Sequence, residues 1–229
     1  MDGPSIPGWA GRDCGSWAGF SENLPGRYRQ TVVFPGEIGL NIGKGSHNQK
    51  KGGGSVLRLY LSRTADGKMD ARALLERALA DRGLEQMPAV ERAPGGKPYF
   101  PDRPELCFSL SHSGPWALCA LGDGPVGADV ETVRPRREAL LRALSAQELA
   151  WFRGRGSRWE DFYTLWTLKE ALAKQDGRGL DRRPEHLRVP LLEPGMSAGL
   201  DGLGFQSFGG PGWRAAVCGP EPVEGFQRV

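Results

Sequence analysis

Apolar and polar positions begin to alternate regularly at residue 56 of the chain. In VLRLYLSR, residues 56–63, leucines recur at every second position, which predicts a strand with one buried face. Residues 69–84 carry an apolar stripe with helical spacing, and Gly83 lies where a helix C-cap is expected. The stripe consists of Ala71, Leu74, Leu75, Ala78 and Leu79.

Two short apolar runs, residues 106–110 and 116–121, predict strands joined by a turn at SHSG, residues 111–114. GDGP at residues 122–125 is a second turn. Residues 126–133 predict the next strand. We expect the second turn to separate two halves of the fold.

Helical patterns dominate the part that follows. Residues 137–152 predict a helix that breaks at Ser145, because Ser145 opens the capping-box sequence SAQE. Asp161 is expected to cap another helix, which runs to about Gln175 and ends before Gly177.

Short strands are predicted for residues 187–218, which close the regular part of the chain. In this order, a set of strands and at least one helix lies on each side of residues 122–125. The predicted fold class is therefore α+β, with an N-terminal half over residues 56–122 and a C-terminal half over residues 123–229.

Residues 1–55 differ from the rest in composition. They hold 13 of the 34 glycines, and their apolar residues show no sustained period. GKGSHNQKKGGGS at residues 43–55 is typical of a linker or a disordered segment. We expect residues 1–55 to be a disordered extension or a non-native one. In the second case KKGGGS is a translated ribosome-binding site and Val56 is the true start.

Composition narrows the class of protein further. The length of 229 residues allows one or two domains, and a net charge of +3 is too balanced to indicate nucleic acid. No apolar run approaches the length of a membrane span, and no secretory signal is visible. The four cysteines have no CxxC spacing, so we expect free thiols and a cytoplasmic protein.

Candidate chemistry gathers in three segments: SLSHSG at residues 109–114, VGADVE at 126–131 and WTLKEALAK at 166–174. On a strand, the carboxylates of VGADVE would share one face. On a helix, the acidic residue and the last lysine of WTLKEALAK would do the same. Taken singly, these are an ordinary strand face, an i,i+4 pair and a turn. Together they suit a hard metal ion and a phosphate-bearing ligand.

In this order and spacing the segments resemble the Sfp-type 4'-phosphopantetheinyl transferase family, whose members move the phosphopantetheine arm of coenzyme A to a serine of a carrier protein. GGKPYFP at residues 95–101, GRGL at 177–180 and WRAAVC at 213–218 extend the resemblance. It implies two similar α+β halves related by a pseudo-twofold, with the active site between them. It also implies a monomer that binds coenzyme A and an apo acyl or peptidyl carrier protein.

The resemblance implies roles for individual residues. Asp129, Glu131 and Glu170 would bind Mg²⁺, and Asp129, Glu170 and Lys174 would be catalytic. Either Glu170 or a metal-bound water would take the proton of the carrier serine, and Lys174 would neutralise the departing 3',5'-ADP. Coenzyme A would be bound by Lys97, Ser111, His112, Lys169 and Lys174.

One departure and two alternatives stand beside this interpretation. The family usually has a longer basic stretch where this chain has TADGKMD, so Lys68, Arg72 and Arg77 are the candidates to clamp the 3'-phosphate. A hydrolase is disfavoured because adjacent Ser and His side chains on a strand point to opposite faces, and no G-x-S-x-G elbow is present. A non-catalytic homologue that binds coenzyme A or carrier protein would be expected to lack a carboxylate or the Lys-Glu pair, and all are present.

RPRR at residues 134–137 is either a solvated face or a contact for an acidic carrier helix.

Overall fold

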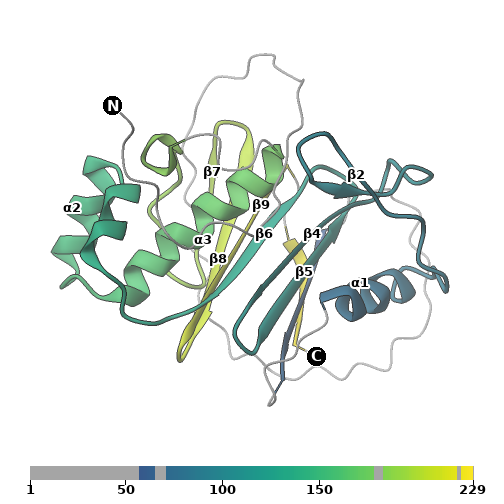
Figure 1. Ribbon diagram of the computed structural model, residues 1–229, viewed down its shortest axis with the longest axis horizontal. Coiled ribbons are helices and arrows are strands. Elements are labelled where there is room, and N and C mark those ends of the chain that lie inside the picture. Colours follow the sequence, from purple (N-terminus) through teal and green to yellow (C-terminus); the bar gives the residue numbers. More distant parts are fainter. Residues whose placement is uncertain (1–56, 65–70, 178–182, 221–222, 229) are drawn as a thin grey trace.

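Two four-stranded sheets pack face to face, and each has a helix on its outer face (Figure 1). This computed structural model describes residues 57–64, 71–177, 183–220 and 223–228. The predicted extension over residues 1–55 lies outside these ranges. The α+β class is confirmed, and the pseudo-twofold stays a prediction.

The first sheet has the order β10-β1-β5-β4. Strand β1 (Leu57–Arg63) pairs antiparallel with β5 (Trp116–Gly122) and parallel with β10 (Val223–Arg228). The predicted alternation of β1 is confirmed, because its three leucines enter the core between the two sheets while Tyr60 faces the helix α1. Strand β10 belongs to the predicted C-terminal half by sequence and to the first sheet by pairing.

Helix α1 (Ala71–Ala80) covers the outer face of the first sheet. Four of the five residues in the predicted stripe are buried, and Gly83 has a positive φ of 79°. A small hairpin of β2 (Glu91–Arg92) and β3 (Pro98–Tyr99) follows and leads to Phe100, which packs under α1.

The hairpin of β4 (Cys107–Ser113) and β5 corrects the predicted turn at SHSG. Ser111 and His112 are strand residues, and Ser113 pairs directly with Trp116. The turn is therefore the two residues Gly114 and Pro115. Gly114 has a φ of 55°, as the first central residue of a type II′ hairpin turn requires.

The second sheet is antiparallel throughout, with the order β6-β9-β8-β7. It consists of β6 (Gly127–Thr132), β9 (Trp213–Gly219), β8 (Leu203–Gly210) and β7 (Ser197–Leu200). The strand predicted over residues 126–133 is confirmed. In the range 187–218, residues 187–196 form no strand, and prolines at 190 and 194 lack the N–H that a ladder needs.

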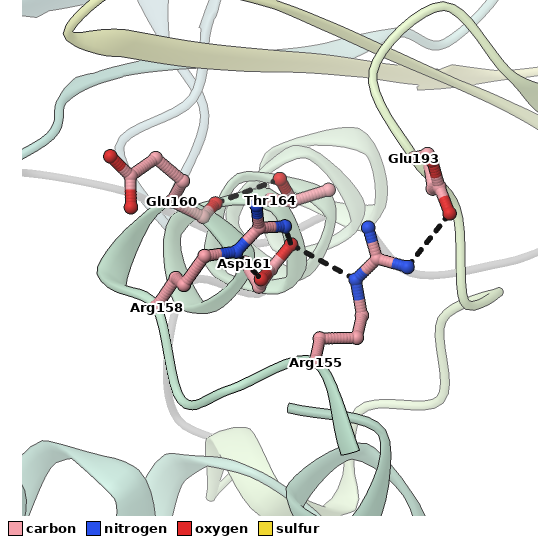
Figure 2. A network of polar contacts seen from close by, with 6 residues as sticks. All are labelled: Arg155, Arg158, Glu160, Asp161, Thr164 and Glu193. Carbon is pink, nitrogen blue, oxygen red and sulfur yellow. Dashed lines mark hydrogen bonds and ion pairs between the residues drawn. The ribbon is translucent and has the colours of Figure 1, made fainter. Parts of the chain in front are cut away.

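Helix α3 (Trp159–Asp176) lies across the outer face of the second sheet (Figure 1). Its predicted end is confirmed, since Gly177 is the C-cap with a φ of 69°. Asp161 is not the cap, because the N-cap is Arg158. Figure 2 shows that the Asp161 carboxylate instead receives hydrogen bonds from Arg155 and Arg158, which draws it into the first turn.

Between β6 and α3 in the sequence, the chain forms a 3-10 helix, η1 (Glu138–Ala143), and helix α2 (Ala146–Gly154). The predicted break at Ser145 is confirmed, with both hydrogen bonds of the capping box present, although the segment before it is a 3-10 helix. A short 3-10 turn, η3 (Pro184–His186), follows α3. No helix in the described ranges is long and apolar enough to cross a membrane.

Three of the four cysteines are described, and Cys119 and Cys218 among them are free thiols. Cys119 and Cys218 are buried, and desolvation raises the pKa of both thiols. They are inert core residues, as expected from the apolar runs around them.

Candidate active site at the seam between the sheets

Strands β4 and β6 are edge strands of different sheets, and serine hydroxyls join them. Ser111 Oγ donates to Asp129 Oδ1 at 2.7 Å, and Ser113 Oγ donates to Glu131 Oε2 at 2.6 Å. Ser109 Oγ accepts from the backbone N of Ala128 at 2.9 Å. The alternation of β4 puts these three hydroxyls on one face, so the first sheet contacts the two carboxylates of the second.

Asp129 lies at the centre of the seam and is 1% exposed. Its Oδ1 accepts from Ser111 and from Lys174 Nζ, which lies 2.7 Å away and also donates to Ala128 O at 3.1 Å. Its Oδ2 is buried and finds no hydrogen-bond partner among the described residues. A buried carboxylate oxygen left unpaired is costly, and a cation would satisfy it.

Gly127 sets how closely α3 approaches β6. A Cβ at this position would lie 1.9 Å from Ala171 O and 2.4 Å from the backbone N of Gln175. Only glycine therefore lets the helix backbone rest directly on the strand. This close approach brings Lys174 within hydrogen-bond distance of Asp129.

Helix α3 runs antiparallel to β6, which places Glu170 in the direction of Glu131. Gly127 contacts residues near 171–175, and Lys174 contacts Asp129. Glu170 lies one turn back, about 6 Å along the helix. Glu131 lies two residues on, about 6.6 Å along the strand. Glu170 is half-buried and shares the helix face of Lys174.

Asp129 and Glu131 on β6 and Glu170 on α3 therefore lie on elements that face each other, and oxygen donors of this kind are the ones that Mg²⁺ prefers. The side chains are not closed around one point: within the described ranges, no three His, Cys, Asp or Glu side chains are arranged to hold a metal ion. The unpaired oxygen of Asp129 is the feature that fits a cation.

Among the described residues, Lys97 and His112 form no hydrogen bond with the three carboxylates, and Lys97 lies at one end of the cluster. Lys97 Nζ donates to Val126 O at 3.1 Å and to Gln175 O at 2.9 Å, so it ties the first half to the start of β6 and the end of α3. Burial lowers the pKa of Lys97 to about 8. His112 is exposed, and the alternation of β4 points it away from the face of Ser111.

Lys169 is not brought into the cluster. Its side chain is 1% exposed and lies 2.8 Å from Glu148 Oε2, on the side of α3 that meets α2. It also donates to the carbonyl oxygens of Pro184 at 2.7 Å and Leu187 at 2.9 Å. Burial lowers its pKa in spite of the ion pair with Glu148.

The candidates for the 3'-phosphate clamp lie elsewhere. Arg72 pairs with Glu76 and Arg77 with Asp81 on the exposed side of α1, and Lys68 lies outside the described ranges. In the RPRR segment, Arg136 Nε donates to Tyr163 Oη at 3.0 Å.

Sequence reasoning missed several residues that fix these elements. Ser113 and Ser109 had a detectable signal, since serines at every second position follow the period of a strand. The start of α3 is held by Arg155, which bridges Asp161 and Glu193 at 3.1 Å and 2.7 Å (Figure 2). That network joins residues far apart in sequence and has no local signal.

Comparison with known proteins covers two of the three segments that carry the candidate chemistry, residues 126–131 and 166–174. The family model of the 4'-phosphopantetheinyl transferase superfamily matches residues 125–197. The chain is 33% identical over 136 residues to "4'-phosphopantetheinyl transferase Sfp" of Bacillus subtilis (strain 168), covering 56% of this chain and 61% of that protein. It is 34% identical over 130 residues to "4'-phosphopantetheinyl transferase AcpT" of Salmonella typhimurium, covering 54% and 68%. The matches span about three fifths of the length of Sfp and of a Bacillus pumilus relative, psf-1.

Proposed function

Because the chain belongs to the 4'-phosphopantetheinyl transferase superfamily, we propose that it transfers 4'-phosphopantetheine from coenzyme A to a serine of an apo acyl or peptidyl carrier protein. The other product is 3',5'-ADP. The observation that carries the proposal is Asp129: a buried carboxylate with one oxygen held by Ser111 and Lys174 and the other without a partner in the described structure.

Asp129, Glu131 and Glu170 are the residues that would hold Mg²⁺. Two are buried on one face of β6 and the third lies on the helix packed against that face. When bound, the ion would neutralise charge on the pyrophosphate of coenzyme A. The unpaired Oδ2 of Asp129 supports a cation in this position.

The chain's own residues would handle the proton and the leaving group. The carrier serine oxygen attacks the phosphorus that bears the pantetheine arm, and the bond from that phosphorus to the 3',5'-ADP oxygen breaks. Glu170 takes the serine proton. Lys174 offers a positive charge to the departing phosphate, one helical turn from Glu170.

The proposed coenzyme A contacts follow from where each cationic side chain lies relative to the carboxylates. Lys174, which lies 2.7 Å from Asp129 Oδ1, stays in the proposal as a phosphate ligand. His112 stays as a second one, on the exposed face of β4 opposite to Ser111. Lys97 and Lys169 already donate to backbone carbonyls and, for Lys169, to Glu148. The proposal therefore gives these two lysines structural roles. It also includes a monomeric, cytoplasmic enzyme with no nucleic-acid partner.

Mass spectrometry of an apo-carrier protein tests the proposal directly. The carrier is incubated with this protein, coenzyme A and Mg²⁺, and we expect a mass gain of one phosphopantetheine. The control carrier has its acceptor serine replaced by alanine, and the control enzyme is Asp129→Ala. Binding of coenzyme A or carrier without any mass gain would instead support a non-catalytic homologue.

A further inference from the structure

We propose that Ser111 and Ser113 of β4 are positioning residues that orient the carboxylates of Asp129 and Glu131 for the metal ion. The inference rests on the proposed function. The first sheet contributes none of the three carboxylates. Through these two serines it nevertheless fixes the orientation of the Asp129 and Glu131 side chains.

The hydrogen bonds are short and directional. Ser111 Oγ lies 2.7 Å from Asp129 Oδ1, and Ser113 Oγ lies 2.6 Å from Glu131 Oε2. Such distances are typical of hydroxyl donors to ionised carboxylates, which are stronger than neutral hydrogen bonds. In each pair the serine engages one carboxylate oxygen, and for Asp129 the other oxygen is the one without a partner in the described structure.

Proton counting separates this role from phosphate binding. A serine hydroxyl carries a single proton. Ser111 gives its proton to Asp129, and a phosphate dianion offers only acceptors. Ser111 therefore cannot donate to coenzyme A while it holds Asp129, which changes the role that the sequence resemblance implied for it.

Ser113 is itself held in place. Its Oγ accepts from the backbone N of Thr132 at 3.1 Å, and Thr132 Oγ1 donates to Ser113 O at 2.8 Å. The turn beside it fits closely, since a Cβ on Gly114 would come within 2.7 Å of Thr132 Oγ1. The hydroxyl proton is thereby directed toward Glu131 and away from the Thr132 amide.

Ser109 provides a matched control within the same strand. It is buried, lies on the same face as the other two serines, and also bridges β4 to β6. Its partners are the N and O atoms of the Ala128 backbone, at 2.9 Å and 3.5 Å, and not a carboxylate. A purely structural role of the ladder would make all three serines equivalent.

The experiment measures Mn²⁺ and Mg²⁺ affinity by calorimetric titration of the full chain. Ser111→Ala and Ser113→Ala should raise the metal Kd by roughly tenfold or more, as outer-shell partners of metal ligands typically do. Ser109→Ala should leave the Kd near the wild-type value. Ser113→Thr, which retains a hydroxyl, should restore most of the affinity. Coenzyme A affinity measured without metal should be unchanged in Ser111→Ala.

The outcomes distinguish this inference from the proposed function. If wild type binds metal and Asp129→Ala does not, but the two serine variants match Ser109→Ala, the positioning role is wrong and the metal site stands. A loss of metal-free coenzyme A affinity in Ser111→Ala would also overturn it, in favour of phosphate binding. If wild type binds no metal, the positioning role and the metal site are both wrong, and the mass assay still decides whether the protein transfers phosphopantetheine. If Ser111→Ala shows no cooperative melting transition, the metal Kd values of Ser113→Ala and Ser113→Thr test the positioning role.

Discussion

Replacing Lys169 tests the buried ion pair that the structure places behind α3. The Lys169 side chain is 1% exposed and the Glu148 side chain 4% exposed, and Lys169 Nζ lies 2.8 Å from Glu148 Oε2. Lys169→Met retains most of the stem but removes the charge. The Glu148 carboxylate then keeps its hydrogen bond from the Ser145 backbone N, at 2.7 Å. The carbonyl oxygens of Pro184 and Leu187 lose the hydrogen bonds that Lys169 donates to them.

The expected cost follows from this environment. Breaking a buried pair by removing one partner typically costs about 3–5 kcal/mol, because the other charge stays buried and uncompensated. For a domain of this size that corresponds to a fall in Tm of roughly 6–20 °C. Glu148→Gln should cost a comparable amount, although its amide oxygen can still accept from Ser145. The double variant should lose less than the sum, with a coupling of about 1 kcal/mol or more.

Urea denaturation followed by tryptophan fluorescence measures these differences, and coenzyme A titration of the folded variants measures function. We expect Lys169→Met to bind coenzyme A as wild type does at temperatures where it is folded, while Lys174→Ala binds it more weakly. If Lys169→Met lowers the free energy of unfolding by less than about 1 kcal/mol, the value for an exposed ion pair, the pair is not buried as described. A selective loss of coenzyme A affinity in Lys169→Met would show that this lysine reaches the ligand.

Three further changes test other contacts. Gly127→Ala should lower the free energy of unfolding by about 1–3 kcal/mol and weaken metal binding, because the added methyl group must displace α3 from β6. An unchanged urea midpoint and an unchanged metal Kd would contradict the close approach of the helix to the strand. Asp129→Asn should reduce transfer by roughly 100-fold or more while the protein still melts cooperatively, and near-normal turnover in the mass assay would remove Asp129 from the site. Lys97 has a folded-state pKa of about 8 against an ordinary 10.5, so the folded protein releases this proton first. The free energy of unfolding of wild type minus that of Lys97→Met should therefore rise from pH 8 to 10.5, by at most about 3.4 kcal/mol. A flat difference in urea titrations across that range would argue against the buried ammonium.

Local rules predicted the elements whose signals are local. The alternating leucines of β1 and the stripe of α1 needed no knowledge of the rest of the chain. The capping box at Ser145 and the glycine after α3 each follow from orphan backbone groups at helix ends. Strand β10 had no such signal, because its parallel pairing with β1 joins the two ends of the described chain.

Helix geometry already separates Lys169 from Lys174, which the sequence resemblance grouped as coenzyme A ligands. At 3.6 residues per turn each residue advances about 100°, so positions 170 and 174 differ by about 40°. Positions 169 and 174 differ by about 140° by the same count, which places Lys169 on another face than Lys174. The structure agrees: Lys174 reaches Asp129, and Lys169 reaches Glu148 on the other side of α3.

The mistaken turn at SHSG has a deeper cause, which bears on the site itself. A strand is usually detected because one of its faces is apolar. The relevant face of β4 carries Ser109, Ser111 and Ser113, because it meets the polar edge of β6 and not the core. Serines followed by glycine therefore look like a turn in sequence. The seam between the sheets is built from side-chain hydrogen bonds, so the residues that hide the strand are the same ones that hold Asp129 and Glu131.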